Sequence, residues 1–182
     1  MPQASDQASD QASDQVSGRA TKHLLIGSTE HYSGKSATVL GLALQMRSQG
    51  IDIAYAKPIG TCLSEGKDAL DEDVRFIAQT LELAPDRVRP TLFVLDEATI
   101  QRQLSKEQRI YGQEVDNLLA TQGEDVLLIE GPGNLEEGTL FGLSLPEMAK
   151  MSHASVVLVT RYSSALIVDK LLAAKEKLGA RL

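Results

Sequence analysis

The chain has 182 residues, a formal net charge of −7 and a single cysteine, Cys62. The length suits one domain, and the acidic charge argues against a general nucleic-acid binder, which normally carries a basic stripe. One cysteine cannot form an intramolecular disulfide, and three scattered histidines do not complete a zinc site with it. No apolar run approaches the ~20 residues of a membrane span and no signal peptide is recognisable, so we expect a soluble, cytoplasmic protein without a membrane partner.

The first 20 residues differ in composition from the rest of the chain. The unit QASD occurs three times in tandem from residue 3, and the segment offers almost no apolar side chains to a core. Such a composition is typical of disorder. We therefore predict a disordered tail over residues 1–20, which we interpret as a flexible tether or a remnant of expression, with a partner-binding peptide as the alternative.

Strand and helix patterns alternate over residues 21–182, which we predict to form one folded domain. In chain order the sequence predicts a strand at 23–27, a helix at 34–50, a strand at 51–58, a helix at 71–83, a strand at 91–95, mostly helix over 97–122, a strand at 124–131, a helix at 144–152, a strand at 154–160 and a helix at 164–178. This rhythm predicts an α/β fold with a mainly parallel sheet flanked by helices on both sides. The sequence ends just after Gly179, where another strand is due, so we expect a piece of a longer chain with an incomplete C-terminus.

The segment GSTEHYSGKS, residues 27–36, joins the first strand to the first helix. The standard phosphate-binding pattern GxxxxGK[ST] has glycine where this chain has Thr29, but Gly34, Lys35 and Ser36 match it. Backbone N–H groups at a helix start favour anions, a lysine reaches the β- and γ-phosphates, and a hydroxyl binds Mg²⁺. A chance Gly-Lys-Ser at a helix start is the alternative. The flanking strand and helix favour a phosphate loop in a three-layer P-loop NTPase fold, with cofactor-binding residues Thr29, Glu30, His31, Tyr32, Ser33, Gly34, Lys35 and Ser36.

Three motifs, in the same order and at similar spacing, resemble those of dethiobiotin synthetases. Their phosphate loop reads TGTDTEVGKT, also with threonine in place of the first glycine. In that family a Lys-Pro pair follows the next strand, as Lys57-Pro58 does here. A later strand of the family ends in EGAGG, where this chain has EGPGN at 130–134. The KPI sequence and the LPEMAK helix resemble still more closely the N-terminal domain of long phosphate acetyltransferases and related stand-alone proteins. In those proteins a DRTGG domain follows. The resemblance covers residues 22–182.

The resemblance implies a site for ATP and Mg²⁺. It assigns phosphate to Lys35, the metal to Ser36, and magnesium-associated acids to Glu130 and Asp73. A solvated strand-end glutamate and an ordinary acidic helix start are the alternatives for these two acids.

Lys57 is the second candidate catalytic residue beside Lys35, because its counterpart in the synthetase helps to bind the substrate. A lysine that snorkels at a strand end is the alternative. Gly131 and Gly133 would let a ligand approach the backbone closely, although a simple turn explains them equally well.

The sequence departs from the synthetase pattern mainly where that family binds its substrate. Tyr32 replaces an acid, Asn134 replaces a glycine, and residues 95–104 replace the segment expected to hold the diamino acid. We therefore favour a regulatory, Mg²⁺-dependent ATP-binding module over an ATP-dependent carbon–nitrogen ligase, with a degenerate interaction surface as a third hypothesis. The expected partners are a nucleotide and either a downstream DRTGG-type domain or a separate protein, and the resemblance also leaves a homodimer open.

Overall fold

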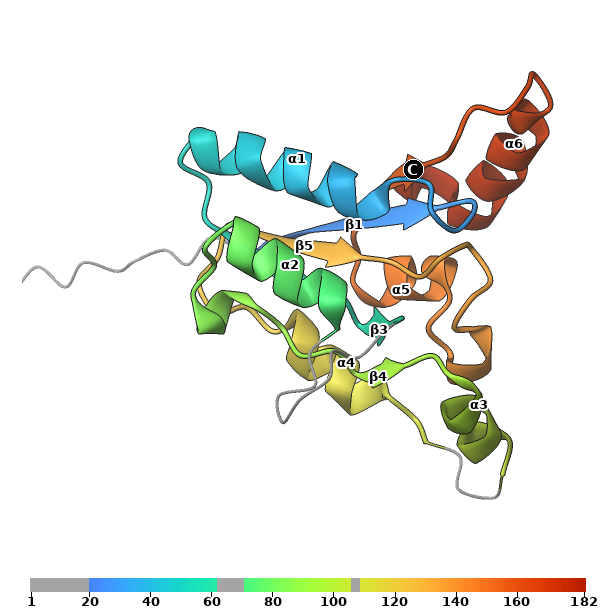
Figure 1. The fold of residues 1–182 in the computed structure, drawn as a ribbon, viewed down its shortest axis with the longest axis horizontal. Coiled ribbons are helices and arrows are strands. Elements are labelled where there is room, and N and C mark those ends of the chain that lie inside the picture. The colour runs from blue at the N-terminus through green and yellow to red at the C-terminus, as the bar shows by residue number, and fades with distance from the viewer. Residues whose placement is uncertain (1–19, 62–70, 106–108) are drawn as a thin grey trace, which may run out of the picture.

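A computed structural model describes residues 20–61, 71–105 and 109–182 of the chain. The predicted tail, except for Ala20, and Cys62 lie outside these ranges. Figure 1 shows a central sheet between helices. Among the described residues, no helix is long and apolar enough to cross a membrane.

The central sheet has four strands in the order β2-β5-β1-β6, and every neighbouring pair is parallel. The four strands are β1 (Lys22–Ser28), β2 (Ile53–Ala56), β5 (Val126–Glu130) and β6 (Ser155–Val159). Parallel neighbours require long crossovers, which helices supply here. The predicted α/β class with a parallel, helix-flanked sheet is therefore confirmed.

Helices cover both faces of this sheet (Figure 1). One face packs against α1 (Lys35–Ser48) and α2 (Glu72–Thr80), and the other packs against α4 (Gly112–Leu119), α5 (Leu145–Met151) and α6 (Ile167–Leu178). The described chain also contains three short 3₁₀ turns, η1 (Pro85–Arg87), η2 (Thr139–Phe141) and η3 (Gly179–Arg181).

Two predicted elements are divided in the structure. The strand expected over 51–58 ends at Ala56, and β3 (Ile59–Gly60) instead pairs with β4 (Phe93–Val94) in a separate two-stranded sheet. Pro58 lies at the break, where its missing N–H cannot continue the ladder. The helical region expected over 97–122 contains two helices, α3 (Glu97–Leu104) and α4.

The two sides of the sheet form two separate apolar clusters. Along β1, Leu25 packs into the cluster beneath α4, α5 and α6, whereas its neighbour Ile26 packs into the cluster beneath α1 and α2. Leu127 and Leu128 of β5 divide in the same way. Successive strand residues point to opposite faces, so the nearly continuous apolar runs in the sequence reflect a sheet that is buried on both sides.

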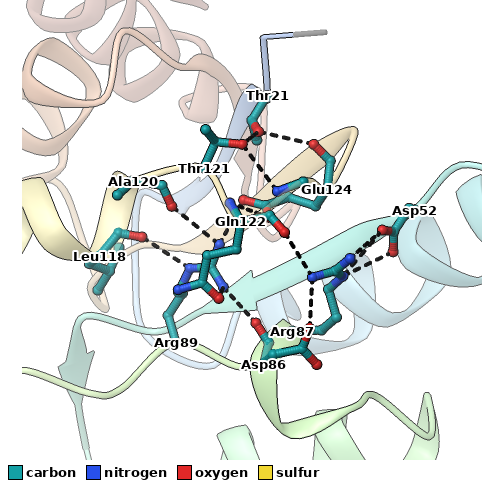
Figure 2. A network of polar contacts seen from close by, with 11 residues as sticks. Thr21, Asp52, Asp86, Arg87, Arg89, Leu118, Ala120, Thr121, Gln122 and Glu124 are labelled. Carbon is teal, nitrogen blue, oxygen red and sulfur yellow. Dashed lines mark hydrogen bonds and ion pairs between the residues drawn. The ribbon is translucent and has the colours of Figure 1, made fainter. Parts of the chain in front are cut away.

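A polar network closes the amino ends of the strands (Figure 2). Arg89 and Glu124 are 2% and 1% exposed, and Nη2 of Arg89 lies 2.7 Å from Oε1 of Glu124. Arg89 also donates to the carbonyl oxygen of Leu118 at 3.2 Å. Nearer the surface, Nη2 of Arg87 lies 2.8 Å from Oδ2 of Asp52. The buried charges are thus paired, as burial requires, and they lie at the end of the sheet opposite to the phosphate loop.

Candidate functional site

The loop between β1 and α1 turns sharply into the helix. Gly34 adopts a left-handed conformation with φ 100° and ψ 22°, which favours glycine, and Tyr32 has φ 54°. No described side chain caps the first turn of α1. The N–H groups at this helix start are therefore left without a side-chain acceptor, and they can receive an anion.

A cleft of about 530 Å³ lies at this loop, at the carboxyl ends of the central strands. This volume is within the range of roughly 300–1,000 Å³ that small-molecule sites usually have. Ligands of open α/β sheets bind at the same end of the strands. The cleft is lined by His31, Tyr32, Ser33, Gly34, Lys35, Ser36, Ala37, Lys57, Ile59, Thr61, Glu72, Asp73, Glu130, Gly131, Pro132, Gly133 and Glu137.

A buried carboxylate connects the phosphate loop to the sheet. Glu130, which is 2% exposed, accepts a hydrogen bond from Oγ of Ser36 at 2.9 Å and another from the hydroxyl of Tyr55 at 2.8 Å. Burial raises the pKa of Glu130, and the nearby Lys57 and the two hydrogen bonds offset only part of that rise. The site therefore places a hydroxyl and a carboxylate together at the start of α1, the oxygen donors that Mg²⁺ prefers.

Lys57 is held by two acids at the start of α2. Its Nζ lies 2.8 Å from Oδ1 of Asp71 and 2.5 Å from Oδ2 of Asp73, and it donates to Oγ1 of Thr61 at 3.2 Å. Burial by itself lowers the pKa of Lys57, but the hydrogen bonds to the two acids outweigh it and the pKa is raised. Asp71 also caps α2, accepting from the backbone N–H groups of Asp73 and Val74. Lys57 is therefore a fixed cation in this structure.

Two polar groups of the phosphate loop have no partner among the residues that the structure describes. Oγ of Ser33 is buried without a hydrogen bond. Lys35 is half-buried, and its ammonium has neither an ion pair nor a hydrogen bond within the described ranges. Burial lowers the pKa of Lys35, and the charge of Glu130 offsets only part of that effect. Both groups are donors that a phosphate oxygen could satisfy.

The loop after β5 packs against the phosphate loop. A Cβ on Gly133 would collide with the ring of His31, so a larger residue would require that half-exposed ring to move. The N–H of Gly133 donates to Oε2 of Glu137, and its carbonyl oxygen accepts from Oγ of Ser28 at 2.8 Å. Gly131 donates its N–H to the carbonyl oxygen of Ile26 at 2.8 Å. Both glycines are thus required for close packing around the cleft.

Thr29 and Glu30 do not line the cleft. Oγ1 of Thr29 lies 2.7 Å from Oγ1 of Thr160, just beyond β6. The carboxylate of Glu30 lies 3.7 Å from Nε of Arg161 and 3.7 Å from Nζ of Lys170. These two residues attach the base of the loop to the neighbouring strand and to α6, and their predicted role in ligand binding remains a prediction.

The remaining predicted site residues all meet at the cleft, together with residues that the sequence did not single out. Asp71 carries a capping signal, an aspartate directly before a helix, that could have identified it. Tyr55 and Glu137 carry no such signal, because each reaches the site through a contact with a residue distant in the chain. They are evident only in the folded structure.

A parallel sheet, a Gly-Lys-Ser loop opening a helix, and an acid at the end of the adjacent strand together define a P-loop NTPase domain, a class that binds nucleotides, typically with Mg²⁺. The sequence pattern of a family described as an AAA domain matches residues 22–181, and the chain belongs to that family.

Two solved structures are similar in fold. The signal recognition particle receptor FtsY from Elizabethkingia anophelis is 12% identical over 88% of this chain and 50% of the receptor chain, with a TM-score of 0.53. The BceF tyrosine kinase domain is 13% identical over 88% of this chain and 66% of that chain, with a TM-score of 0.46. This chain spans about half of the receptor chain, and the likeness to the receptor concerns the fold alone.

Proposed function

We propose that this domain is an Mg²⁺-dependent ATP-binding module of the dethiobiotin synthetase-like type, similar to the N-terminal domain of long phosphate acetyltransferases, and that its role is regulatory. The observation that carries the proposal is the ammonium of Lys35. It lines the cleft and makes no ion pair or hydrogen bond with the described residues, although the charge of Glu130 acts on it from a distance. The phosphates of a nucleotide would give this ammonium a direct partner.

Ser36 and Glu130 would hold the metal ion. Mg²⁺ is usually bound by one or two carboxylates together with substrate phosphates, not by a cage of protein ligands. In the described part of the chain, no group of three or more His, Cys, Asp or Glu side chains could hold a metal ion, which suits an ion that arrives with its nucleotide. Asp73 pairs with Lys57 through Oδ2, so it could assist the metal ion through its other carboxylate oxygen.

The ligase alternative has one observation in its favour and two against it. Lys57 and Thr61 line the same cleft as Lys35, as a substrate site would require. However, two carboxylates already occupy the ammonium of Lys57. No residue of the 95–104 segment lines the cleft, and α3 packs against η2. These contacts support the module over the enzyme.

Calorimetric titration of the protein with ATP and with GTP, in Mg²⁺ and in EDTA, tests the proposal. We expect saturable, Mg²⁺-dependent ATP binding that Lys35→Ala abolishes. Lys175→Ala, which removes an exposed lysine of α6, is the matched control and should bind as the wild type does. Wild-type protein that binds no nucleotide, or a Lys35→Ala variant that binds normally, would refute the proposal. A turnover assay on the binding-competent protein then separates the module from the ligase.

A further inference from the structure

We propose that Glu137 is a specificity-determining residue of the nucleotide site, because its carboxylate is an internal anion that competes with the terminal phosphate of a nucleoside triphosphate. This inference rests on the proposed nucleotide binding. It adds to that proposal a means by which the site distinguishes a triphosphate from a diphosphate.

The carboxylate of Glu137 is held by a backbone donor and lies beside the phosphate loop. Its side chain is 16% exposed and lines the cleft. Oε2 accepts the backbone N–H of Gly133, in the loop after β5, and lies 3.8 Å from Nε2 of His31, in the phosphate loop. A backbone N–H that faces a cleft is a donor suited to an anion, and here a side chain of the same protein occupies it.

The backbone around Glu137 is fixed independently of this contact. Oδ1 of Asn134 accepts the N–H of Glu136 at 2.9 Å and the N–H of Glu137 at 2.8 Å. The Glu137 side chain can therefore rotate away from Gly133 while the Asn134 turn that carries it stays in place. A ligand that takes the Gly133 N–H needs to displace a side chain and not a loop.

The backbone donor that Glu137 occupies lies in the same cleft as the groups expected to hold the β- and γ-phosphates. Gly133 follows Glu130 by three residues, and Glu130 is bonded to Ser36, the hydroxyl that would meet a metal ion bridging the β- and γ-phosphates. Lys35 and Glu137 line the same cleft; burial lowers the pKa of Lys35, while the charges of Glu130 and, less strongly, Glu137 act in the opposite direction. The carboxylate is thus within electrostatic reach of the lysine expected at these same phosphates.

Titrations with Mg²⁺-ATP and with Mg²⁺-ADP test the inference in wild type, Glu137→Gln, Glu136→Gln and Lys35→Ala. Glutamine still accepts the Gly133 N–H but lacks the charge, so Glu137→Gln isolates the electrostatic competition. We expect it to tighten ATP binding by about fivefold or more, because the ligand then displaces a neutral and not a charged acceptor from the Gly133 N–H, and to change ADP binding far less. Glu136→Gln is the matched control, because Glu136 is 65% exposed and pairs with Lys177, and it should change neither affinity.

The outcomes separate the two proposals. Wild-type protein that binds no nucleotide refutes the nucleotide site and this inference with it. Lys35-dependent ATP binding that Glu137→Gln leaves unchanged, weakens, or strengthens equally for ADP refutes this inference alone. Amide NMR gives a second measurement on the wild type: the Gly133 N–H resonance should shift with Mg²⁺-ATP and stay in place with Mg²⁺-ADP, and equal shifts with both nucleotides would contradict the inference.

Discussion

Ser36 and Glu130 are 94 positions apart in the chain, yet Oγ of Ser36 donates to Oε1 of Glu130 at 2.9 Å. The bond joins the first turn of α1 to the last residue of β5, so the hydroxyl of the phosphate loop and the acid of the adjacent strand are already in place before a ligand arrives. Tyr55 holds the second oxygen of Glu130 and fixes its orientation.

Replacement of Ser36 by alanine should remove the metal-dependent part of nucleotide binding. We expect Ser36→Ala to weaken ATP binding in Mg²⁺ by about tenfold or more, in line with the usual cost of disturbing a metal's ligand set, and to leave binding in EDTA unchanged. Ser48→Ala, at the exposed far end of the same helix, is the control. Equal losses in Mg²⁺ and in EDTA would show that Ser36 acts on the nucleotide and not on the metal.

The stability of the metal-free protein should depend on pH through Glu130. Burial raises its pKa above the ordinary value of 4.5. Between the ordinary and the raised pKa, the folded state holds a proton that the unfolded chain releases, so the free energy of unfolding falls as pH rises through that window. Glu130→Gln should remove this slope and unfold at a higher urea concentration than the wild type at neutral pH, with the difference vanishing below pH 4.5. Parallel pH profiles for the two proteins would contradict this expectation.

The buried pair at the opposite end of the sheet should be sensitive to the loss of one partner. Arg89→Met leaves Glu124 with an uncompensated buried charge, which typically costs about 3–5 kcal/mol. We expect urea denaturation to show a loss of this size, and the double variant Arg89→Met/Glu124→Leu to recover most of it. Arg109→Ala, which breaks an exposed pair with Glu114, should leave the denaturation curve unchanged. A double variant as unstable as Arg89→Met would refute the explanation by unpaired charge.

Gly131 should tolerate no larger side chain. A Cβ there would lie 2.6 Å from Cδ1 of Leu145 and 3.2 Å from the carbonyl oxygen of Ile26, so Gly131→Ala should cost about 1–3 kcal/mol through overpacking. Leu145→Val in the same chain should return part of that loss. Gly41→Ala is the opposite control. Gly41 lies on α1, and a Cβ there would meet no atom of the surrounding structure within 4 Å. The substitution should therefore stabilise the helix by about 0.5–1 kcal/mol. Chemical denaturation of these three variants and the wild type measures these changes.

The fold was largely predictable because its strands and helices have strong periodic signals. The apolar runs around Leu128 and Val157 indicated strands buried on both faces, and each lies in the central sheet. The strand predicted at 91–95 contains β4, but its pairing with β3 was not foreseen, because the two residues of β3 leave no period to detect. Its pairing depends on the break that Pro58 imposes after β2 and on contacts between distant segments.

The site was predictable only where adjacent residues carry its chemistry. Gly34, Lys35 and Ser36 are consecutive, and Glu130 ends an apolar run, so each has a local signal. The roles of Tyr55, Asp71 and Glu137 arise from partners brought together by the sheet and by α2. The Lys-Pro pair in the sequence does not indicate that the ammonium of Lys57 forms ion pairs with two carboxylates.

Burial on both faces has a consequence for how the strands find their pairing. When one face of a sheet is exposed to solvent, a register shift of one residue moves apolar side chains into water and is therefore unfavourable. Both faces of β5 are apolar and buried, so the hydrophobic effect alone would oppose such a shift only weakly. Glu124 before the strand and Glu130 at its end supply that resistance, since a slip would turn the Glu130 carboxylate away from Ser36 and Tyr55 and pull Glu124 from Arg89. The two buried acids therefore fix the alignment of the sheet, and one of them also shapes the cleft.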